Sequence, residues 1–175
     1  MKREFFKRAA IIVIAAVTMS VSAVAQQGDK AVGGNLVIGT GNSYTNIGIG
    51  AKFLYNVTDP IRLAGEFDFF LKKDYMSMWD FSVYGHYLFS VADKVVVYPS
   101  VGLGIVGSKV SFPSTTIWGE TIPGFSASGS DFAFSLGGGA DYPLTSNLVL
   151  NGELRIKLYN GGNRINFAIG VAYKF

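Results

Sequence analysis

The 175-residue sequence contains no cysteine. Disulfide bonds, cysteine-ligated zinc sites and lipid anchors on cysteine are therefore excluded. Charged residues make up only 15% of the chain. After residue 25, no apolar run approaches the roughly 20 residues that a membrane-spanning helix requires. The chain is instead rich in glycine (22 residues) and in aromatic rings (14%). This composition excludes a disordered chain and, beyond the N-terminus, a helical membrane protein.

The N-terminal segment has the pattern of a secretory signal peptide. Four lysines and arginines surround its start, residues 9–17 form an apolar core, and Ala23-Val24-Ala25 is an A-x-A cleavage site. We expect a signal peptide, 1–25, and one mature domain, 26–175; an uncleaved anchor is the alternative. The signal holds four of the 15 basic and one of the 12 acidic residues, so 11 of each remain. This neutral mature domain gives no support for nucleic-acid binding.

Alternation of apolar and polar residues with a period of two predicts eight β-strands in the mature domain. In the last strand, Phe167, Ile169 and Val171 share one face, and small or polar residues occupy the other. Short and longer connections alternate along the chain. The predicted strands cover residues 31–39, 46–57, 61–71, 78–90, 95–108, 130–143, 148–158 and 164–175. Pro99 removes a hydrogen-bond donor inside the fifth strand, so we expect a bulge or local irregularity there, or a later strand start.

The two strand faces distinguish a soluble barrel from one in a membrane. Small residues gather on one face: Gly48, Gly50, Gly102, Gly104, Gly137, Gly139, Ala168, Gly170 and Ala172. Aromatic rings gather on the other: Phe53, Tyr55, Phe67, Phe69, Trp79, Phe81, Phe89, Phe132, Phe134, Phe167, Tyr173 and Phe175. Such a belt of rings favours aggregation in water but suits lipid, and a narrow lumen accommodates small residues. We predict an all-β fold: an eight-stranded antiparallel up-and-down transmembrane β-barrel. A soluble lipocalin-like carrier is the weaker alternative.

The inward face also carries acidic and basic residues in near balance. We predict that they form an ion-pair network that fills the lumen, because an uncompensated charge there is costly. With a three-residue turn at 58–60, Lys52 lies directly opposite Glu66, and we expect these two to pair. Acid–base catalysis by carboxylates such as Glu66 and Asp68 is the alternative, but no cleft for a substrate is evident. The predicted network comprises Lys52, Arg62, Glu66, Asp68, Asp80, Asp141, Glu153, Arg155 and Lys157.

Two further features resemble cofactor or catalytic motifs. The segment 102–107 matches G-x-G-x-x-G, but it lies within a strand and no helix follows, which excludes a dinucleotide site. His86 is the only histidine and should face the lumen, where Ser82 and Ser90 lie four residues away along the strand. We therefore predict no catalytic residue, no metal site and no cofactor.

The chain ends on an aromatic residue that follows alternating apolar ones. Tyr173 and Phe175 resemble the assembly signal of Gram-negative outer-membrane barrels. With the signal peptide and eight strands, the sequence resembles the small outer-membrane β-barrel family, which includes the transmembrane domain of outer-membrane protein A and short porin-like relatives. The resemblance implies an outer-membrane location with both ends in the periplasm. It also implies that the partners are outer-membrane lipids, lipopolysaccharide, periplasmic chaperones and the barrel-assembly machinery.

These expectations favour a structural or surface-interaction role, similar to adhesion, over an enzymatic one. The longest connection, 109–129, holds Phe112, Trp118 and Phe125, which are candidates for binding a surface ligand. The same segment could instead pack on the barrel rim or extend the flanking strands. Two alternatives remain: a narrow porin-like channel for small solutes or ions, and a lipid A-modifying enzyme that uses His86.

Overall fold

The structure, a computed structural model, describes residues 26–41, 44–92, 94–117 and 120–175. The predicted signal peptide, 1–25, lies outside this part of the chain. No helix within the described residues is long and apolar enough to cross a membrane. The strands are β1 (Lys30–Gly41), β2 (Tyr44–Asn56), β3 (Ile61–Lys73), β4 (Met76–Tyr87), β5 (Phe89–Ala92), β6 (Val95–Phe112), β7 (Thr115–Ile117), β8 (Glu120–Ile122), β9 (Phe125–Pro143), β10 (Leu148–Tyr159) and β11 (Gly162–Lys174).

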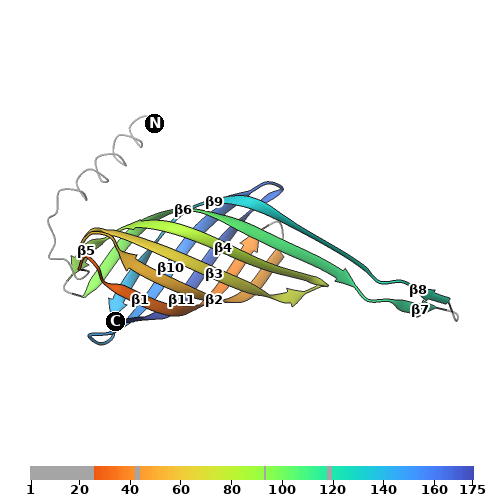
Figure 1. Cartoon of the computed structure of the whole chain (residues 1–175), viewed down its shortest axis with the longest axis horizontal. Helices are drawn as coiled ribbons and strands as arrows, with labels where there is room; N and C mark the ends of the chain where they lie inside the picture. Colours follow the sequence, from red (N-terminus) through yellow and green to blue (C-terminus); the bar gives the residue numbers. More distant parts are fainter. Residues whose placement is uncertain (1–25, 42–43, 93, 118–119) are drawn as a thin grey trace, which may run out of the picture.

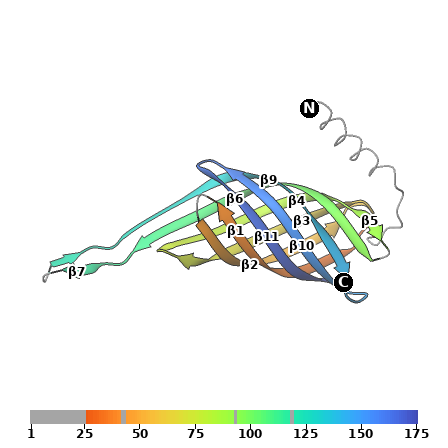
Figure 2. The ribbon, with the colours of Figure 1, turned by 180° about the vertical axis from the view of Figure 1, so that it is seen from behind.

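The long strands form one closed antiparallel sheet. Each pairs with the next along the chain, and β1 pairs with β11 to close the cylinder. Figure 2 shows these two strands side by side on the near wall. β4 and β5 are two parts of one strand, interrupted at Leu88, and both pair with β6. The barrel therefore has eight strands, which confirms the predicted fold.

The strand bounds follow the alternation pattern closely except in one hairpin. β6 continues to Phe112, and β9 begins at Phe125, which is directly opposite in the ladder. Between them, β7 and β8 pair with each other. The segment 109–129, predicted as a connecting loop, is therefore mostly a β-hairpin that projects well beyond the barrel (Figure 1). We call this segment the projecting hairpin, and the opposite end of the barrel the short-turn end.

The irregularity expected near Pro99 lies in the neighbouring strand. β6 neither bulges nor starts late, because it begins at Val95 and keeps Pro99 in register with Gly138 of β9. On its other side, the strand made of β4 and β5 is interrupted at Leu88, two residues past the His86–Ser100 pair. Proline cannot donate to the ladder at this point. The amide of Leu88 donates to the carbonyl of Pro60, next to the start of β3, at 2.8 Å.

Side chains alternate between a buried interior and an exposed wall. Arg155 and Lys157 are at most 2% exposed, whereas Phe167, Ile169 and Val171 are 41–49% exposed. A soluble barrel has the reverse arrangement, with its bulky apolar face inside. The backbone pairing closes on itself, as spanning a bilayer without water requires. The predicted orientation is confirmed: polar and small residues face inward, and apolar residues face outward.

Four tyrosines form a ring on the outer wall at the short-turn end. Tyr55, Tyr87, Tyr142 and Tyr173 are 37–53% exposed, and each lies near the end of its strand. Tyrosine prefers the interface between lipid tails and water because its ring is apolar and its hydroxyl is polar. This ring therefore marks one edge of the apolar band of the barrel.

The apolar band predicts a cost for outward charge that depends on depth. Ile169→Arg, in the middle of β11, should lower the free energy of unfolding by about 2–4 kcal/mol, because the guanidinium meets lipid tails. Asn163→Arg, at the hairpin end of the same strand, is the control and should cost about 0–1 kcal/mol. Urea titration of the protein folded in vesicles, followed by tryptophan fluorescence, measures both. Equal costs would contradict the assigned band.

Candidate functional site

Ten charged side chains are buried inside the barrel, and their charges balance. The acidic ones are Glu66, Asp68, Asp80, Asp141 and Glu153, and the basic ones are Lys52, Arg62, Arg155, Lys157 and Arg164. Burial of a charge is costly unless a counter-charge and hydrogen bonds compensate it. We describe three layers of contacts, called upper, middle and lower, from the projecting hairpin toward the short-turn end.

The middle layer is a closed ring of two acids and two bases. Lys52 and Glu66 are cross-strand neighbours in β2 and β3, as predicted, and their charged atoms lie 3.5 Å apart. Lys52 also contacts Glu153 of β10 at 2.7 Å. Arg155 bridges the two acids, at 2.6 Å from Glu66 and 2.9 Å from Glu153. The ring therefore connects β2 and β3, near the start of the chain, with β10, near its end, across the lumen.

The upper layer is centred on Asp80 of β4. Lys157 of β10 donates to Asp80 at 2.7 Å and to the hydroxyl of Ser82 at 2.9 Å. Arg164 of β11 forms an ion pair with the second oxygen of the same carboxylate. The guanidinium of Arg164 also lies over the ring of Phe70, 4.2 Å from its centroid. One carboxylate therefore joins three strands.

The lower layer combines an ion pair with stacked rings. Arg62 of β3 contacts Asp141 of β9 at 2.5 Å and donates from Nε to Nδ1 of His86 at 3.1 Å. The imidazole stacks on Tyr98, with centroids 4.5 Å apart, and Arg62 lies 4.6 Å from the same ring. Arg62 and Tyr98 therefore both hold His86 in the interior.

Asp68 is the one predicted network residue without an ion pair among the described residues. It is 1% exposed and accepts a hydrogen bond from the amide of Asn35 at 3.3 Å. In the ladder it lies directly opposite Asp80, so two carboxylates are neighbours here. All the other predicted network residues, from Lys52 to Lys157, take part in one of the three layers.

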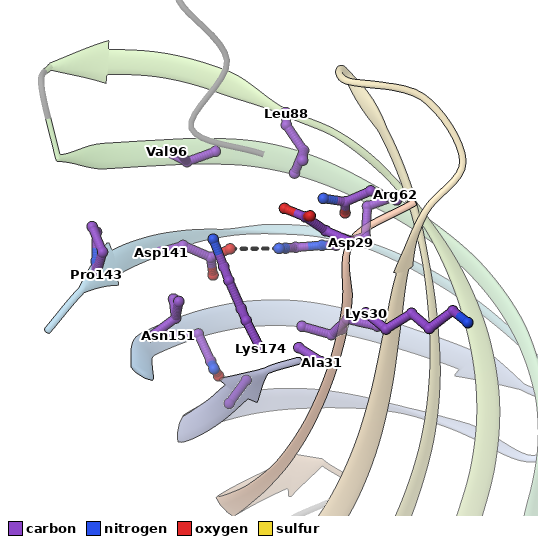
Figure 3. A pocket seen from close by; sticks show the side chains of 14 residues that line it. Asp29, Lys30, Ala31, Arg62, Leu88, Val96, Asp141, Pro143, Asn151 and Lys174 are labelled. Carbon is purple, nitrogen blue, oxygen red and sulfur yellow. Dashed lines mark hydrogen bonds and ion pairs between the residues drawn. The ribbon is translucent and has the colours of Figure 1, made fainter. Parts of the chain in front are cut away.

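A small cavity lies below the lower layer, at the short-turn end. Its volume is about 40 Å³, and Arg62, Asp141 and Leu88 contribute to its lining. Figure 3 shows the pair of Arg62 and Asp141 at this cavity, with Lys174 reaching toward it and Lys30 pointing away. A water molecule occupies about 30 Å³ in the liquid. The cavity therefore has room for a few water molecules.

The sequence analysis did not predict the aromatic rings in the interior of the barrel. Three aromatic rings are at most 2% exposed: those of Phe70, Tyr84 and Tyr98. Each lies beneath or beside an arginine. The partner of Tyr84 is Arg155, whose guanidinium lies 4.3 Å from the ring centroid. Such cation–π contacts add stability when they are shielded from water. The signal was available, because Phe70 falls on the same strand face as Asp68 in the alternation.

The surface-ligand candidates lie at the base of the projecting hairpin. Phe112 and Phe125 face each other across the ladder and are 51% and 63% exposed. Tyr75, which the sequence analysis missed, packs its ring 5.3 Å from that of Phe112. Trp118 lies outside the described residues. We call Tyr75, Phe112 and Phe125 the hairpin patch.

The predicted assembly signal lies on the lipid-facing wall at the short-turn end. Tyr173 and Phe175 are 53% and 65% exposed. The amide of Phe175 donates to the carbonyl of Lys30 at 3.0 Å, so the last residue still contacts the first strand. The role of these two rings in assembly stays a prediction.

Comparison with known proteins gives one family and several related folds. The family model described as the outer membrane protein beta-barrel domain matches residues 9–175. Neisserial surface protein A has a TM-score of 0.60 at 14% identity, with 84% of this chain and 96% of that chain covered. The attachment invasion locus protein Ail of Yersinia pestis has a TM-score of 0.55 at 16% identity, with 86% and 100% covered. No curated protein matches the sequence.

The middle layer predicts a large effect of a conservative change. Glu66→Gln keeps the shape but leaves Lys52 and Arg155 with less counter-charge, so it should lower the free energy of unfolding by about 3–5 kcal/mol. Asp59→Asn, in an exposed turn, should change it by less than about 1 kcal/mol. Urea unfolding in vesicles compares the two variants. A cost for Glu66→Gln as small as that for Asp59→Asn would show that the ring contributes little.

Proposed function

The chain belongs to the outer membrane protein beta-barrel domain family and resides in the outer membrane, and we propose that it acts there as a surface-interaction protein. In this proposal, the filled barrel is the anchor and the projecting hairpin is the binding element. The related folds are under 25% identical, so the proposal rests on this chain's own hairpin. We also propose that its partners are outer-membrane lipids, periplasmic chaperones and the barrel-assembly machinery.

The observation that carries the proposal is the reach of the hairpin with its exposed rings. In an extended strand each residue rises by about 3.3 Å, so residues 109–117 span up to about 30 Å. Figure 1 shows the hairpin extending along the barrel axis, away from the short-turn end. Tyrosine and phenylalanine are both enriched at protein interfaces relative to the rest of the surface. The hairpin patch lies at the base of this hairpin, so its exposed rings stand where β6 and β9 leave the barrel and the tip lies further out.

A strained turn supports the patch from below. Asp74 and Tyr75 join β3 to β4 with φ angles of 48° and 65°, values that non-glycine residues rarely adopt. The carbonyl of Tyr75 accepts a hydrogen bond from the amide of Ser111 at 2.9 Å, and its ring packs on Phe112. Glycine would fit the backbone better but would supply no ring. The turn thus fixes the base of the hairpin.

The free edge of β9 favours a protein partner. β9 pairs with β6 from Phe125 onward but with β10 only from Ala133 onward. Within the described residues, the backbone of 125–132 therefore has one unpaired edge, without the lysine or proline that usually protects an edge strand. Extended protein segments bind such edges by main-chain hydrogen bonds.

The interior argues against the two alternative functions. A channel requires the three layers to separate, and their side chains are almost fully buried. An enzyme would require an activated His86. Its Nδ1 already accepts a bond from Arg62, and its Nε2 has no hydrogen-bond partner among the described residues, so no serine is joined to it. We therefore propose a role without catalysis and without a standing pore.

Removal of the hairpin should abolish attachment. Cells that carry the chain with residues 111–126 replaced by Asn-Gly, which joins the cross-strand partners Val110 and Ala127, should attach to a surface coated with mixed extracellular-matrix protein no better than cells without the chain. The barrel stays intact because β6 and β9 still pair below the hairpin. Phe134→Leu, on the lipid-facing wall, is the control and should attach like the intact chain. Attachment that survives the deletion would overturn the proposal.

Conductance and lipid analysis test the alternatives. In planar bilayers the intact chain should show no steady conductance, since the three layers of buried side chains fill the lumen. A conductance that Lys52→Ala or Glu66→Ala abolishes would favour the channel. Overexpression should leave lipid A unchanged; a modification that His86→Ala abolishes would favour the enzyme.

A further inference from the structure

The outer wall changes from apolar to polar within two rows of side chains on β4, β6 and β9. In one row, Phe81 faces Ile105, which faces Phe132. Two rows further toward the hairpin, Ser77 faces Lys109, which faces Ser128 in the same way. A bilayer requires such a boundary where the lipid tails end and the headgroups begin. These strands therefore place Lys109 at the level of the headgroups in the outer leaflet.

A groove of about 500 Å³ lies at this boundary. Phe69 and Trp79 line its apolar part, and Ser77, Lys109, Ser128 and Ser130 line its polar part. The groove exists because the residues beside Trp79 are small. A Cβ on Gly107 would overlap the indole ring, so the glycine allows the ring to lie against the strand.

The ammonium group of Lys109 is available for a ligand. Lys109 is exposed, and no described residue forms an ion pair with it. Its two cross-strand neighbours are serines, which offer hydroxyls but no counter-charge. Asp131, the acid nearest along β9, falls on the inward side of the alternation with Ala133 and Ser135. The groove therefore has a net positive charge.

We propose that this groove binds the phosphorylated sugar headgroup of an outer-leaflet glycolipid of the lipid A type. The ammonium of Lys109 pairs with the phosphate, the serine hydroxyls bond to the sugar, and the indole of Trp79 packs against the sugar ring. Phe69 contacts the start of the acyl chains. The proposal depends on the membrane orientation of the barrel and not on the attachment role of the hairpin.

The fluorescence of Trp79 can report binding in the groove, because the chain has only two tryptophans. In a Trp118→Phe background, Trp79 is the only indole and lies in the groove. The protein is folded in phosphatidylcholine vesicles, and diphosphoryl lipid A is added in steps. Trp79 emission should change and saturate, and Lys109→Gln should raise the half-saturating lipid A fraction about tenfold, since it removes a charge-assisted bond to the phosphate.

Control variants and lipids separate this site from general attraction to anionic lipid. Lys94→Gln, in a turn at the opposite end, should leave the titration unchanged, and Gly107→Val should weaken it by displacing the indole. Dephosphorylated lipid A, phosphatidylglycerol and inorganic phosphate should each give no saturable change. Migration on gels before and after boiling verifies that each variant is folded.

Three results would overturn the proposal. They are an equal response to phosphatidylglycerol and lipid A, a response to inorganic phosphate alone, and an unchanged titration for Lys109→Gln. Attachment of cells through the hairpin is measured separately, and Lys109→Gln should leave it unchanged. Loss of lipid A binding with intact attachment, or the reverse, therefore shows which of the two proposals fails.

Discussion

The absence of water from the bilayer interior determines the rest of this structure. Backbone groups in lipid must find partners within the protein, so the sheet closes on itself through β1 and β11. After the sheet closes, one face of every strand meets the interior of the barrel and the other meets lipid. Polar side chains turn toward the narrow interior, and rings and branched aliphatic side chains turn toward lipid. The buried ion pairs, the tyrosine ring and the groove on the outer wall all follow from this separation.

In the narrow lumen, buried acidic and basic side chains compensate one another. The five acids and five bases balance, and the middle ring shares each charge between two partners. Such networks add little net stability over apolar packing, but loss of one partner is costly. The arrangement therefore acts mainly to keep the strands in register and the lumen full. A barrel built this way is a rigid support for the hairpin outside the membrane.

The sequence predicts most of the fold because alternation with a period of two is specific to strands. The strand ends, the inward orientation and the pairing of Lys52 with Glu66 all follow from it. The pattern is less informative where both faces meet water, and for this reason β6 and β9 extend further than predicted. It also gives no warning that Phe70 and Tyr84 pack beneath arginines, or that Tyr75 adopts a strained turn. Those features depend on contacts between residues far apart in the chain.

Closure between the first and last strands has a kinetic consequence. β1 pairs with β11 at ten positions, from Ala31–Lys174 to Thr40–Ile165, across almost the whole length of the mature chain. Contacts between residues so distant in sequence make folding slow, because the entropy of loop closure is lost before the pairing energy is gained. No partial barrel is free of open edges, so the chain exposes its rings and strand edges until the final strand pairs with the first. In water, the stage before closure is therefore the one at which aggregation competes most strongly with folding.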